Sequence, residues 1–277
     1  MDSAQKSARL QKIAHECREE ILPMIYKAAS GHPGGSLSAI DMIVALFCEE
    51  MRWDPKNPHW DERDRFVLSK GHAVPALYAV LYKHGVVTKD ELPTLRQIGS
   101  RLQGHPDRVI MPVVEASTGS LGQGLSIAQG MAMGLKLKGS DARVFCLIGD
   151  GESQEGQIWE TAMSAPKFKL NNLICFLDNN NGQIDGTVEQ VMDIRPIVDK
   201  WEAFRWYVQE IDGHSMPAIL GALEKCRKEK DRPCMIVAKT IKGKGISFME
   251  GNIDWHGKAP NDTEFKKAME ELKAKNP

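Results

Sequence analysis

The stretch Val144-Phe145-Cys146-Leu147-Ile148-Gly149-Asp150-Gly151-Glu152 places an apolar run directly before a glycine-rich turn. A second apolar run, 173–177, is followed by Asp178-Asn179-Asn180. Between the two runs lies 157–163, whose pattern predicts a helix. Strand, turn, helix and strand form a βαβ unit of a parallel sheet. We therefore expect an α/β fold, a doubly wound, mostly parallel sheet with helices on both faces.

Polar groups follow both apolar runs, and open parallel sheets bind ligands at the carboxyl ends of their strands. Glycines at 149 and 151 let the backbone approach a diphosphate, and amides at a helix start favour its negative charge. The oxygens of Asp150 and Asn180 are hard ligands that suit Mg²⁺ or Ca²⁺. The alternative interpretation is a chance glycine-rich turn followed by an asparagine-rich loop.

The spacing of these residues resembles the thiamine diphosphate signature, because Asn180 lies 30 residues after Asp150. In that family the aspartate and the final asparagine ligate the metal, and a backbone carbonyl two residues further on completes the set. The resemblance thus implies Asp150, Asn180 and Gly182 as ligands of Mg²⁺, with Ca²⁺ or Mn²⁺ as substitutes.

Further motifs narrow the resemblance to the N-terminal, diphosphate-binding half of transketolase. They run in family order from about Ser30 to Pro260: Ser30-Gly31-His32-Pro33-Gly34, Ser69-Lys70-Gly71-His72-Ala73, Gly104-His105-Pro106, Thr118-Gly119-Ser120-Leu121-Gly122-Gln123-Gly124, Ile184-Asp185-Gly186 and Trp255-His256-Gly257. Related enzymes that make deoxyxylulose phosphate lack the His-Pro pair of the first motif. The resemblance therefore implies the thiamine diphosphate-binding fold and transketolase chemistry.

Four of the eight histidines stand in these motifs, and imidazole suits proton transfer near neutral pH. In the family, the residue matching His105 holds the terminal hydroxyl of the donor sugar. Residues matching His32 and His256 handle the proton and carbonyl of the acceptor, and His72 and His256 match positions near the cofactor diphosphate. The remaining histidines have no motif around them, and we interpret them as surface or satisfied core residues: His15, His59, His84 and His214.

The resemblance also implies a set of cofactor-binding residues, namely His72, Gly119, Ser120, Leu121, Gly149, Asp150, Gly151, Glu152, Asn180, Lys242 and His256. Lys242 stands on a glycine-bounded loop after the apolar run 235–238, where a cation suits a phosphate. A solvated basic loop is the alternative. Glu155 matches a carboxylate that the family places between two cofactor sites. The alternative is that Glu155 only stabilises the start of a helix, where the helix dipole favours a negative charge.

The composition fits one large α/β domain, and we expect a single diphosphate-side domain over residues 1–277. The chain has 36 Lys and Arg residues and 37 Asp and Glu residues, so its net charge is close to zero. This balance gives no electrostatic reason to expect nucleic acid or an anionic membrane as a partner. The six cysteines show no CxxC pattern and mostly lie in apolar runs. They indicate buried thiols in a reducing compartment, and we expect a cytoplasmic protein.

Periodicity predicts the outer elements. We expect helices over 3–29, over 36–51 with Ser36 or Ser38 as its cap, over 120–137 and over 262–275. The short run 65–68 is expected to be a strand that delivers His72 to its carboxyl end.

No part of the chain resembles the pyrimidine-binding half of transketolase, whose glutamate protonates the cofactor. We therefore expect an N-terminal subunit of a split transketolase, which transfers a two-carbon ketol unit between sugar phosphates with a separate C-terminal subunit. Two copies of each chain would form a heterotetramer. The alternatives are an N-terminal fragment of a single-chain enzyme and a non-catalytic or regulatory thiamine diphosphate-binding subunit. The terminus after a charged helix suits a natural subunit.

Overall fold

Five parallel strands form the centre of the protein. The computed structural model describes residues 2–275, and its main sheet has the order β1-β2-β3-β7-β6. The strands are β1 (Arg65–Leu68), β2 (Val144–Gly149), β3 (Leu173–Asn179), β7 (Cys234–Lys239) and β6 (Tyr207–Asp212). All four pairings are parallel, so every carboxyl end lies at one edge. The predicted parallel sheet is confirmed.

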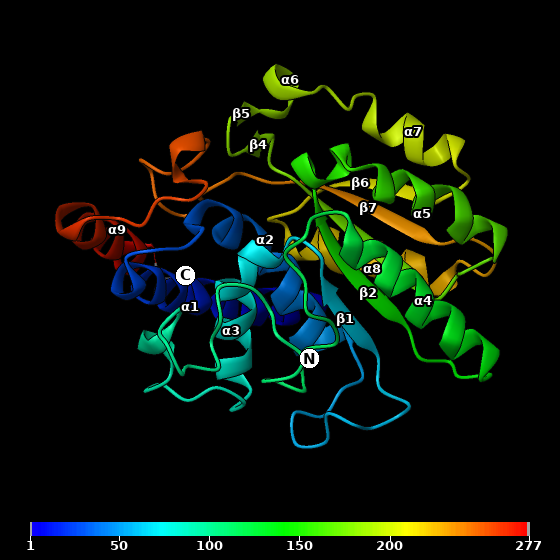
Figure 1. Ribbon diagram of the computed structural model, residues 1–277, viewed down its shortest axis with the longest axis horizontal. Coiled ribbons are helices and arrows are strands. Elements are labelled where there is room, and N and C mark those ends of the chain that lie inside the picture. The colour runs from blue at the N-terminus through cyan, green and yellow to red at the C-terminus, as the bar shows by residue number, and fades with distance from the viewer. Residues whose placement is uncertain (1, 276–277) are drawn as a thin grey trace.

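Helices cover both faces of this sheet (Figure 1). One face packs against α1 (Ser3–Ala28), α2 (Pro33–Ala45), α3 (Val74–Lys83) and α8 (Met216–Lys228), with α9 (Asp262–Ala274) beside α1. The other face packs against α4 (Gln123–Leu137), α5 (Gly156–Lys167) and α7 (Ile197–Ala203). The fold is therefore the doubly wound α/β arrangement expected from the sequence.

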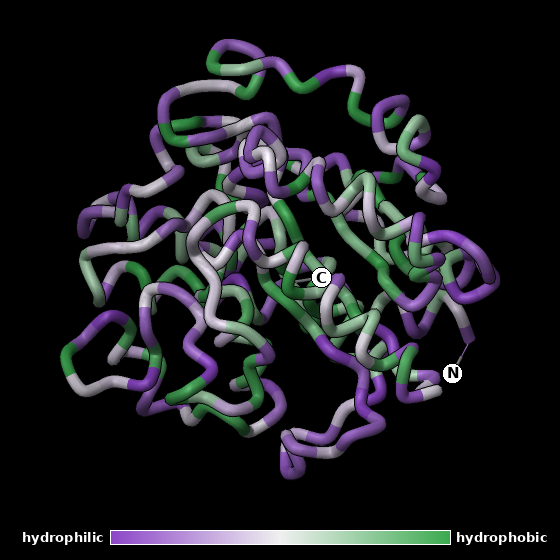
Figure 2. Tube along the Cα trace, turned by 45° about the vertical axis from the view of Figure 1, so that its right-hand side comes forward, coloured by the Kyte–Doolittle hydropathy of each residue, from purple (hydrophilic) through white to green (hydrophobic). Residues whose placement is uncertain are grey.

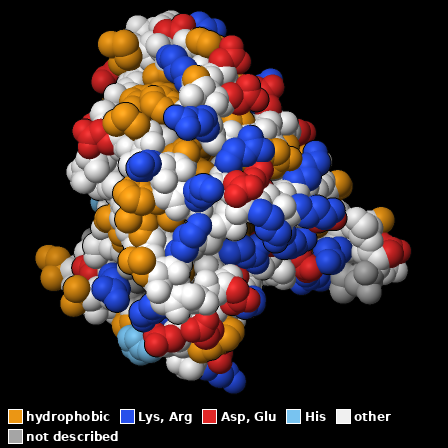
Figure 3. Space-filling view, turned by 90° about the vertical axis from the view of Figure 1, so that its right-hand side faces the viewer, with side chains coloured by type: hydrophobic (Ala, Val, Ile, Leu, Met, Phe, Trp, Pro, Cys, Tyr) orange, Lys and Arg blue, Asp and Glu red, His pale blue; other side chains and the backbone are white. Residues whose placement is uncertain are grey.

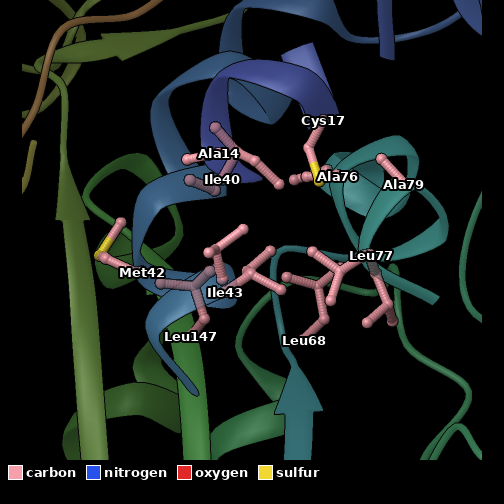
Figure 4. Packing of buried hydrophobic residues seen from close by; sticks show 14 of the residues in the cluster. Ala14, Cys17, Ile40, Met42, Ile43, Leu68, Ala76, Leu77, Ala79 and Leu147 are labelled. Carbon is pink, nitrogen blue, oxygen red and sulfur yellow. The ribbon is translucent and has the colours of Figure 1, made fainter. Parts of the chain in front are cut away.

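Alternation along β2 explains how two cores form. Phe145 and Leu147 join the core under α1–α3, whereas Val144, Cys146 and Ile148 join the core under α4 and α5. A strand that is apolar at every position suits a sheet buried on both faces. Figure 2 shows the hydrophobic segments gathered in these central strands. Figure 4 shows the first core, where side chains from α2, α3 and two strands meet: Ile43, Leu77, Leu68 and Leu147.

The helix predicted over 36–51 begins earlier and ends differently. It starts at Pro33 and changes at Leu46 into a π-helix that ends at Glu50. The predicted caps are wrong, because Ser36 and Ser38 lie inside the helix and bond elsewhere. The Ser36 hydroxyl donates to the carbonyl of His32 at 2.8 Å. Proline has no backbone N–H, so the first position of the helix does not need a capping side chain. Its fixed φ already suits a helix, and the helix therefore begins at Pro33.

The other predicted elements differ from the structure only at their ends. The first helix spans Ser3–Ala28, with Asp2 and Gln5 forming a capping box. The helix predicted from 120 begins at Gln123, because Gly122 adopts a left-handed φ of 85°. Sequence periodicity did not predict β4 (Gly182–Gln183), β5 (Gly186–Thr187) or α6 (Val188–Val191), which lie at the top of Figure 1.

The outer surface mixes charges of both signs. Figure 3 shows Lys and Arg side chains gathered over the middle of one face, with Asp and Glu among them. Several charges on the surface pair locally, as Lys228 does with Glu224 and Arg232 with Glu229. Within residues 2–275, no helix combines the length and apolar character needed to cross a membrane.

Candidate active site

Asp150 occupies the glycine-rich turn at the carboxyl end of β2. Its side chain is buried, and its carboxylate accepts hydrogen bonds from the backbone N–H of Gly151 at 2.8 Å and of Asn181. Burial, and then the negative charge of Asp178, raise the pKa of Asp150 to about 6. A cation beside this carboxylate would offset both effects.

Two more oxygens reach the same sheet edge from the segment after β3. The side-chain oxygen of Asn180 accepts from the N–H of Gly182 at 3.0 Å, and the carbonyl of Gly182 accepts from Lys242 Nζ at 3.0 Å. Carboxylate, amide and carbonyl oxygens are the ligands of hard divalent cations. Residues 2–275 contain no group of three or more His, Cys, Asp or Glu side chains around one metal position. Asp150, Asn180 and the Gly182 carbonyl offer three oxygens, fewer than an octahedral cation takes, so phosphate oxygens or water would complete the ligand set of a cation here.

These residues line a pocket of about 190 Å³ at the carboxyl edge of the sheet. Its wall includes Lys70, His72, Leu121, Gly149, Asp150, Gly151, Glu152, Glu155, Asn180, Gly182, Lys242 and His256. Lys242 is 1% exposed, and burial, followed by the charge of Lys70, lowers its pKa to about 8. At neutral pH the pocket floor therefore still carries positive charge for an anion.

Glu152 has a different setting from the other pocket residues. Its carboxylate accepts from the backbone N–H of Gly122 at 2.9 Å, from that of Gly149 at 3.0 Å and from the hydroxyl of Ser69. The side chain is almost fully enclosed, and burial raises its pKa. These bonds fasten the start of α4 and the end of β1 to the glycine-rich turn.

Three motif histidines from distant parts of the chain form one cluster. The ring centroids of His32 and His72 lie 5.1 Å apart, those of His72 and His256 5.3 Å, and those of His32 and His256 5.6 Å. They come from the start of α2, the turn after β1 and the turn after the 3₁₀ segment Ile253–Trp255. His72 and His256 also line the pocket, so the cluster opens onto the glycine-rich turn.

The imidazoles of this cluster are neutral at neutral pH. Burial, and then Arg96, lower the pKa of His32 to about 4. Burial, and then Lys242, lower that of His256 to about 3, and burial, with Lys70, holds the pKa of His72 well below its usual range. A neutral imidazole can accept one proton and donate another through its second nitrogen. The cluster is therefore equipped for proton transfer to and from hydroxyl and carbonyl groups.

His105 lies at the exposed side of the cluster. A Cβ at Gly119 would come within 2.7 Å of the His105 ring, and Gly119 has a φ of 136°, so glycine allows this close approach. The backbone at Gly119 also packs against the loop that carries His72, because a Cβ at Gly71 would lie 2.9 Å from the nitrogen of Gly119. Ser120 is exposed, and Leu121 reaches the pocket wall.

Arg96 joins the loops of two histidines, although no sequence motif marks it. Its guanidinium donates to Ser30 Oγ at 3.2 Å, to His32 Nδ1 at 3.4 Å and to the carbonyl of Gly104 at 3.5 Å. Its own backbone adopts a left-handed φ of 60°. Because Nδ1 of His32 accepts this bond, the ring carries its proton on Nε2.

A buried ion pair that the sequence did not predict joins the pocket wall to the end of β3. Lys70 Nζ contacts the Asp178 carboxylate, with 2% and 0% of the two side chains exposed. Ser38 Oγ donates to the same carboxylate at 2.7 Å, and Thr240 donates to its other oxygen. Burial opposes ionisation of Asp178, but the charge and hydrogen bond of Lys70 outweigh it and lower its pKa. The available signal was position, because Lys70 stands in the motif of His72 and Asp178 stands two residues before Asn180.

The histidines outside the motifs lie away from the cluster. His59 is exposed, His15 is buried in α1, and His84 contacts Cys48 Sγ at 3.5 Å. His214 bonds to Asp41 and to the backbone at Ile241.

Comparison with known proteins gives the same assignment. The family described as transketolase, thiamine diphosphate binding domain, matches residues 10–276. The 6-deoxy-6-sulfo-D-fructose transketolase subunit SqwG of Clostridium sp. strain MSTE9 is 44% identical over 263 residues, which cover 95% of this chain and 96% of that one. One subunit of the apulose-4-phosphate transketolase from Phocaeicola vulgatus is 40% identical over 255 residues, covering 92% and 90%.

A solved structure agrees with these relatives. The transketolase of Campylobacter jejuni superposes with a TM-score of 0.90 at 36% identity, covering 95% of this chain and 42% of that one. The chain thus spans less than half of that transketolase chain, but nearly the whole length of the two subunits. The chain belongs to the transketolase family of enzymes and contains its thiamine diphosphate-binding domain.

Proposed function

We propose that the chain is the diphosphate-binding subunit of a two-chain transketolase, which transfers a two-carbon ketol unit from a ketose phosphate to an aldose phosphate. The observation that carries this proposal is that a cluster of histidines lies next to a pocket suited to a phosphate ligand. The His32–His72–His256 cluster opens onto a pocket whose floor holds Asp150 and Lys242. A module that only bound the cofactor would need Asp150, Lys242 and the two histidines on the pocket wall, but not the His32 imidazole beside them.

The metal in this proposal is Mg²⁺, with Ca²⁺ or Mn²⁺ as substitutes. Asp150, Asn180 and the Gly182 carbonyl would hold it, since these residues line one pocket and their oxygens suit hard cations. The ion would neutralise the diphosphate and the buried carboxylate together.

The cofactor in this proposal is thiamine diphosphate. Its diphosphate would lie against the glycine-rich turn, Lys242 and the segment 119–121, with His72 and His256 beside it. Glu152 would act through the loops that it fastens. When bound, thiamine diphosphate supplies the carbon nucleophile and electron sink that carbon–carbon bond cleavage requires.

The four motif histidines would handle the substrate. His105, at the exposed side, would hold the terminal hydroxyl of the donor sugar. His32, with its proton on Nε2, would donate to the carbonyl oxygen of the acceptor, and His256 would take and return a proton. Their depressed pKa values leave the rings neutral before substrate arrives, and a bound diphosphate would raise these pKa values and so help the rings to take up a proton, since it offsets the charge of Lys242.

The partner would be a separate pyrimidine-binding subunit. Support comes from the relatives of matching length, which are named as transketolase subunits, and from the solved transketolase chain, of which this chain covers 42%. We further propose that residues 1–277 form a single domain, since two cores share one sheet. A cytoplasmic location fits the six free cysteines in the described part of the chain.

The test is a steady-state assay of ketol transfer from a ketose phosphate to an aldose phosphate, with Mg²⁺ and thiamine diphosphate. The chain is assayed alone, the partner alone and the two mixed. We expect activity only in the mixture. A mixture that binds the cofactor but turns over no sugar would favour the non-catalytic subunit, and robust transfer by the pure chain would overturn the two-chain proposal.

A further inference from the structure

His214 links helix α2 to the loop that carries Lys242. Its Nδ1 lies 2.7 Å from Asp41 Oδ2, and its Nε2 accepts the backbone N–H of Ile241 at 2.8 Å. Because an N–H points at Nε2, that nitrogen carries no proton, so Nδ1 must donate to Asp41. The two neighbours thus fix both the tautomer and the orientation of the ring.

The carboxylate that orients His214 is itself held rigidly. Arg18 of α1 donates through Nη1 at 3.1 Å and through Nη2 at 2.5 Å to the two oxygens of Asp41 in α2. Side-chain exposures are 9% for Arg18, 6% for Asp41 and 13% for His214. Paired planar groups of this kind have little freedom to turn, and bidentate pairs are among the stronger hydrogen-bonded contacts.

Ile241 precedes Lys242, whose position allows little movement. A Cβ at Gly34 would lie 2.8 Å from Lys242 Cγ, and one at Gly182 would lie 2.9 Å from its Cδ. The N–H of Gly243 donates to the carbonyl of Gly34 at 3.0 Å. The bond from Ile241 to His214 thus anchors the amino side of Lys242 together with Thr240, whose N–H donates to the carbonyl of Asn179 at 3.1 Å, and Gly243 anchors its carboxyl side.

We propose that His214 is a positioning residue, which the Arg18–Asp41 pair holds in its Nδ1–H tautomer so that the loop at Ile241 aims Lys242 at the diphosphate. The inference rests on the proposed function for the identity of that anion. It gives His214 a role beyond that of a satisfied core residue, although the side chain is not part of the pocket wall.

The first measurement needs no cofactor. Amide hydrogen exchange of residues 240–245 is compared in the full chain and in His214→Phe, which keeps a ring but cannot accept from Ile241. We expect exchange at the Ile241 amide to rise about tenfold, the scale of one lost hydrogen bond. His214→Gln can still accept and donate, and should restore most of the protection. His59→Phe is the matched control at an exposed histidine and should change nothing.

The second measurement tests the link to Lys242 with inorganic pyrophosphate and Mg²⁺ as the probe. His214→Phe should weaken pyrophosphate binding about five- to tenfold, and His214→Gln should recover it. In a Lys242→Met background the same His214→Phe change should cost nothing further, because the two residues act through one contact.

The outcomes separate the two proposals. Unchanged exchange in His214→Phe would overturn the positioning role whatever the chain binds. Raised exchange with unchanged pyrophosphate affinity, or an equal loss in the Lys242→Met background, would show that the ring only supports the fold. Failure of the parent chain to bind Mg²⁺ with thiamine diphosphate, in the presence of its partner, would count against the proposed function instead.

Discussion

Asp150 is a buried carboxylate whose charge is unfavourable until a cation arrives. Its folded pKa of about 6 lies above the usual 3.8, so the folded state holds this proton more tightly than the unfolded state does. The contribution to stability is therefore fully present below about pH 4 and is lost as the pH rises through about 6. At pH 7 the ionised group destabilises the metal-free chain.

The prediction concerns Asp150→Asn, which keeps the shape and removes the charge. In EDTA at pH 7 the variant should be more stable than the parent by up to about 2–3 kcal/mol, and the difference should vanish towards pH 4. Unfolding by urea at both pH values measures this difference in stability.

In the same variant, calorimetry should show that Mg²⁺-dependent binding of thiamine diphosphate is abolished. Unchanged affinity would contradict the ligand assignment.

A second prediction concerns the protonation of His32 and His256 in the unliganded chain. Their C2–H resonances should titrate near pH 4 and pH 3, well below 6.5, because burial and nearby cations oppose a further positive charge. Pyrophosphate should raise both midpoints, since it offsets the charge of Lys242. NMR titration with His256→Gln as the assignment control measures this. Midpoints near 6.5 would mean that the cluster is open to water.

A third prediction concerns turnover in the assembled enzyme. His105→Ala and His256→Ala should each lower kcat by roughly a hundredfold or more, the scale for removing an acid–base group. The apparent affinity for thiamine diphosphate should fall in His256→Ala but not in His105→Ala, because of these two only His256 lines the pocket. Near-normal turnover in both variants would show that these rings are structural.

At the scale of elements, helix α4 shows how tightly the site is packed against the sheet. A Cβ at Gly124 would meet the Cα of Ser69 at 2.6 Å, while Gly130 on the same helix has open space. Gly124 thus brings the start of α4 against the loop that carries Lys70 and His72. Gly130 has no such reason to be glycine.

This contrast gives a matched pair of substitutions. Gly130→Ala should stabilise the chain by up to about 1 kcal/mol, because alanine favours the helix and loses less entropy on folding. Gly124→Ala should destabilise it by about 1–3 kcal/mol, because backbone must move. Thermal unfolding of the two variants measures the difference. Equal effects of the same sign would show that α4 does not approach β1 this closely.

The sequence predicted the elements that carry strong local patterns. The uniformly apolar run ending at Ile148 and the motif spacing indicated the parallel sheet and the residues at its edge, including Asp150 and Asn180. Local patterns could not predict the contacts that join distant segments. Arg96 touches His32 across 64 residues and Lys70 meets Asp178 across 108, and neither pairing leaves a periodic signal.

Cap predictions failed for a related reason. Ser38 is a good cap by type, yet its hydroxyl donates to Asp178, far along the chain. A polar side chain with a distant partner looks like a local cap when only the sequence is seen. The buried ion pair and its hydroxyl neighbours form one network, whose existence depends on the fold that the apolar runs create.

At the scale of the whole molecule, part of the site is open to solvent. His105 and Glu155 are exposed, and Ile184 at the pocket wall is 68% exposed. An exposed rim of this kind leaves a bound cofactor in contact with water. We therefore expect the chain alone to hold thiamine diphosphate only weakly.

The last prediction is that affinity and assembly rise together. Mixing the chain with its pyrimidine-binding partner should produce a heterotetramer of two copies of each chain, with Glu155 near the centre and an interface above about 2,000 Å². Native mass spectrometry measures the stoichiometry, and calorimetry of the same samples should show tighter binding of thiamine diphosphate than for the chain alone. Asp150→Asn is the control, because it should still assemble while binding no cofactor. Full affinity in the unmixed chain, or a complex of one copy of each chain that is fully active, would contradict this arrangement.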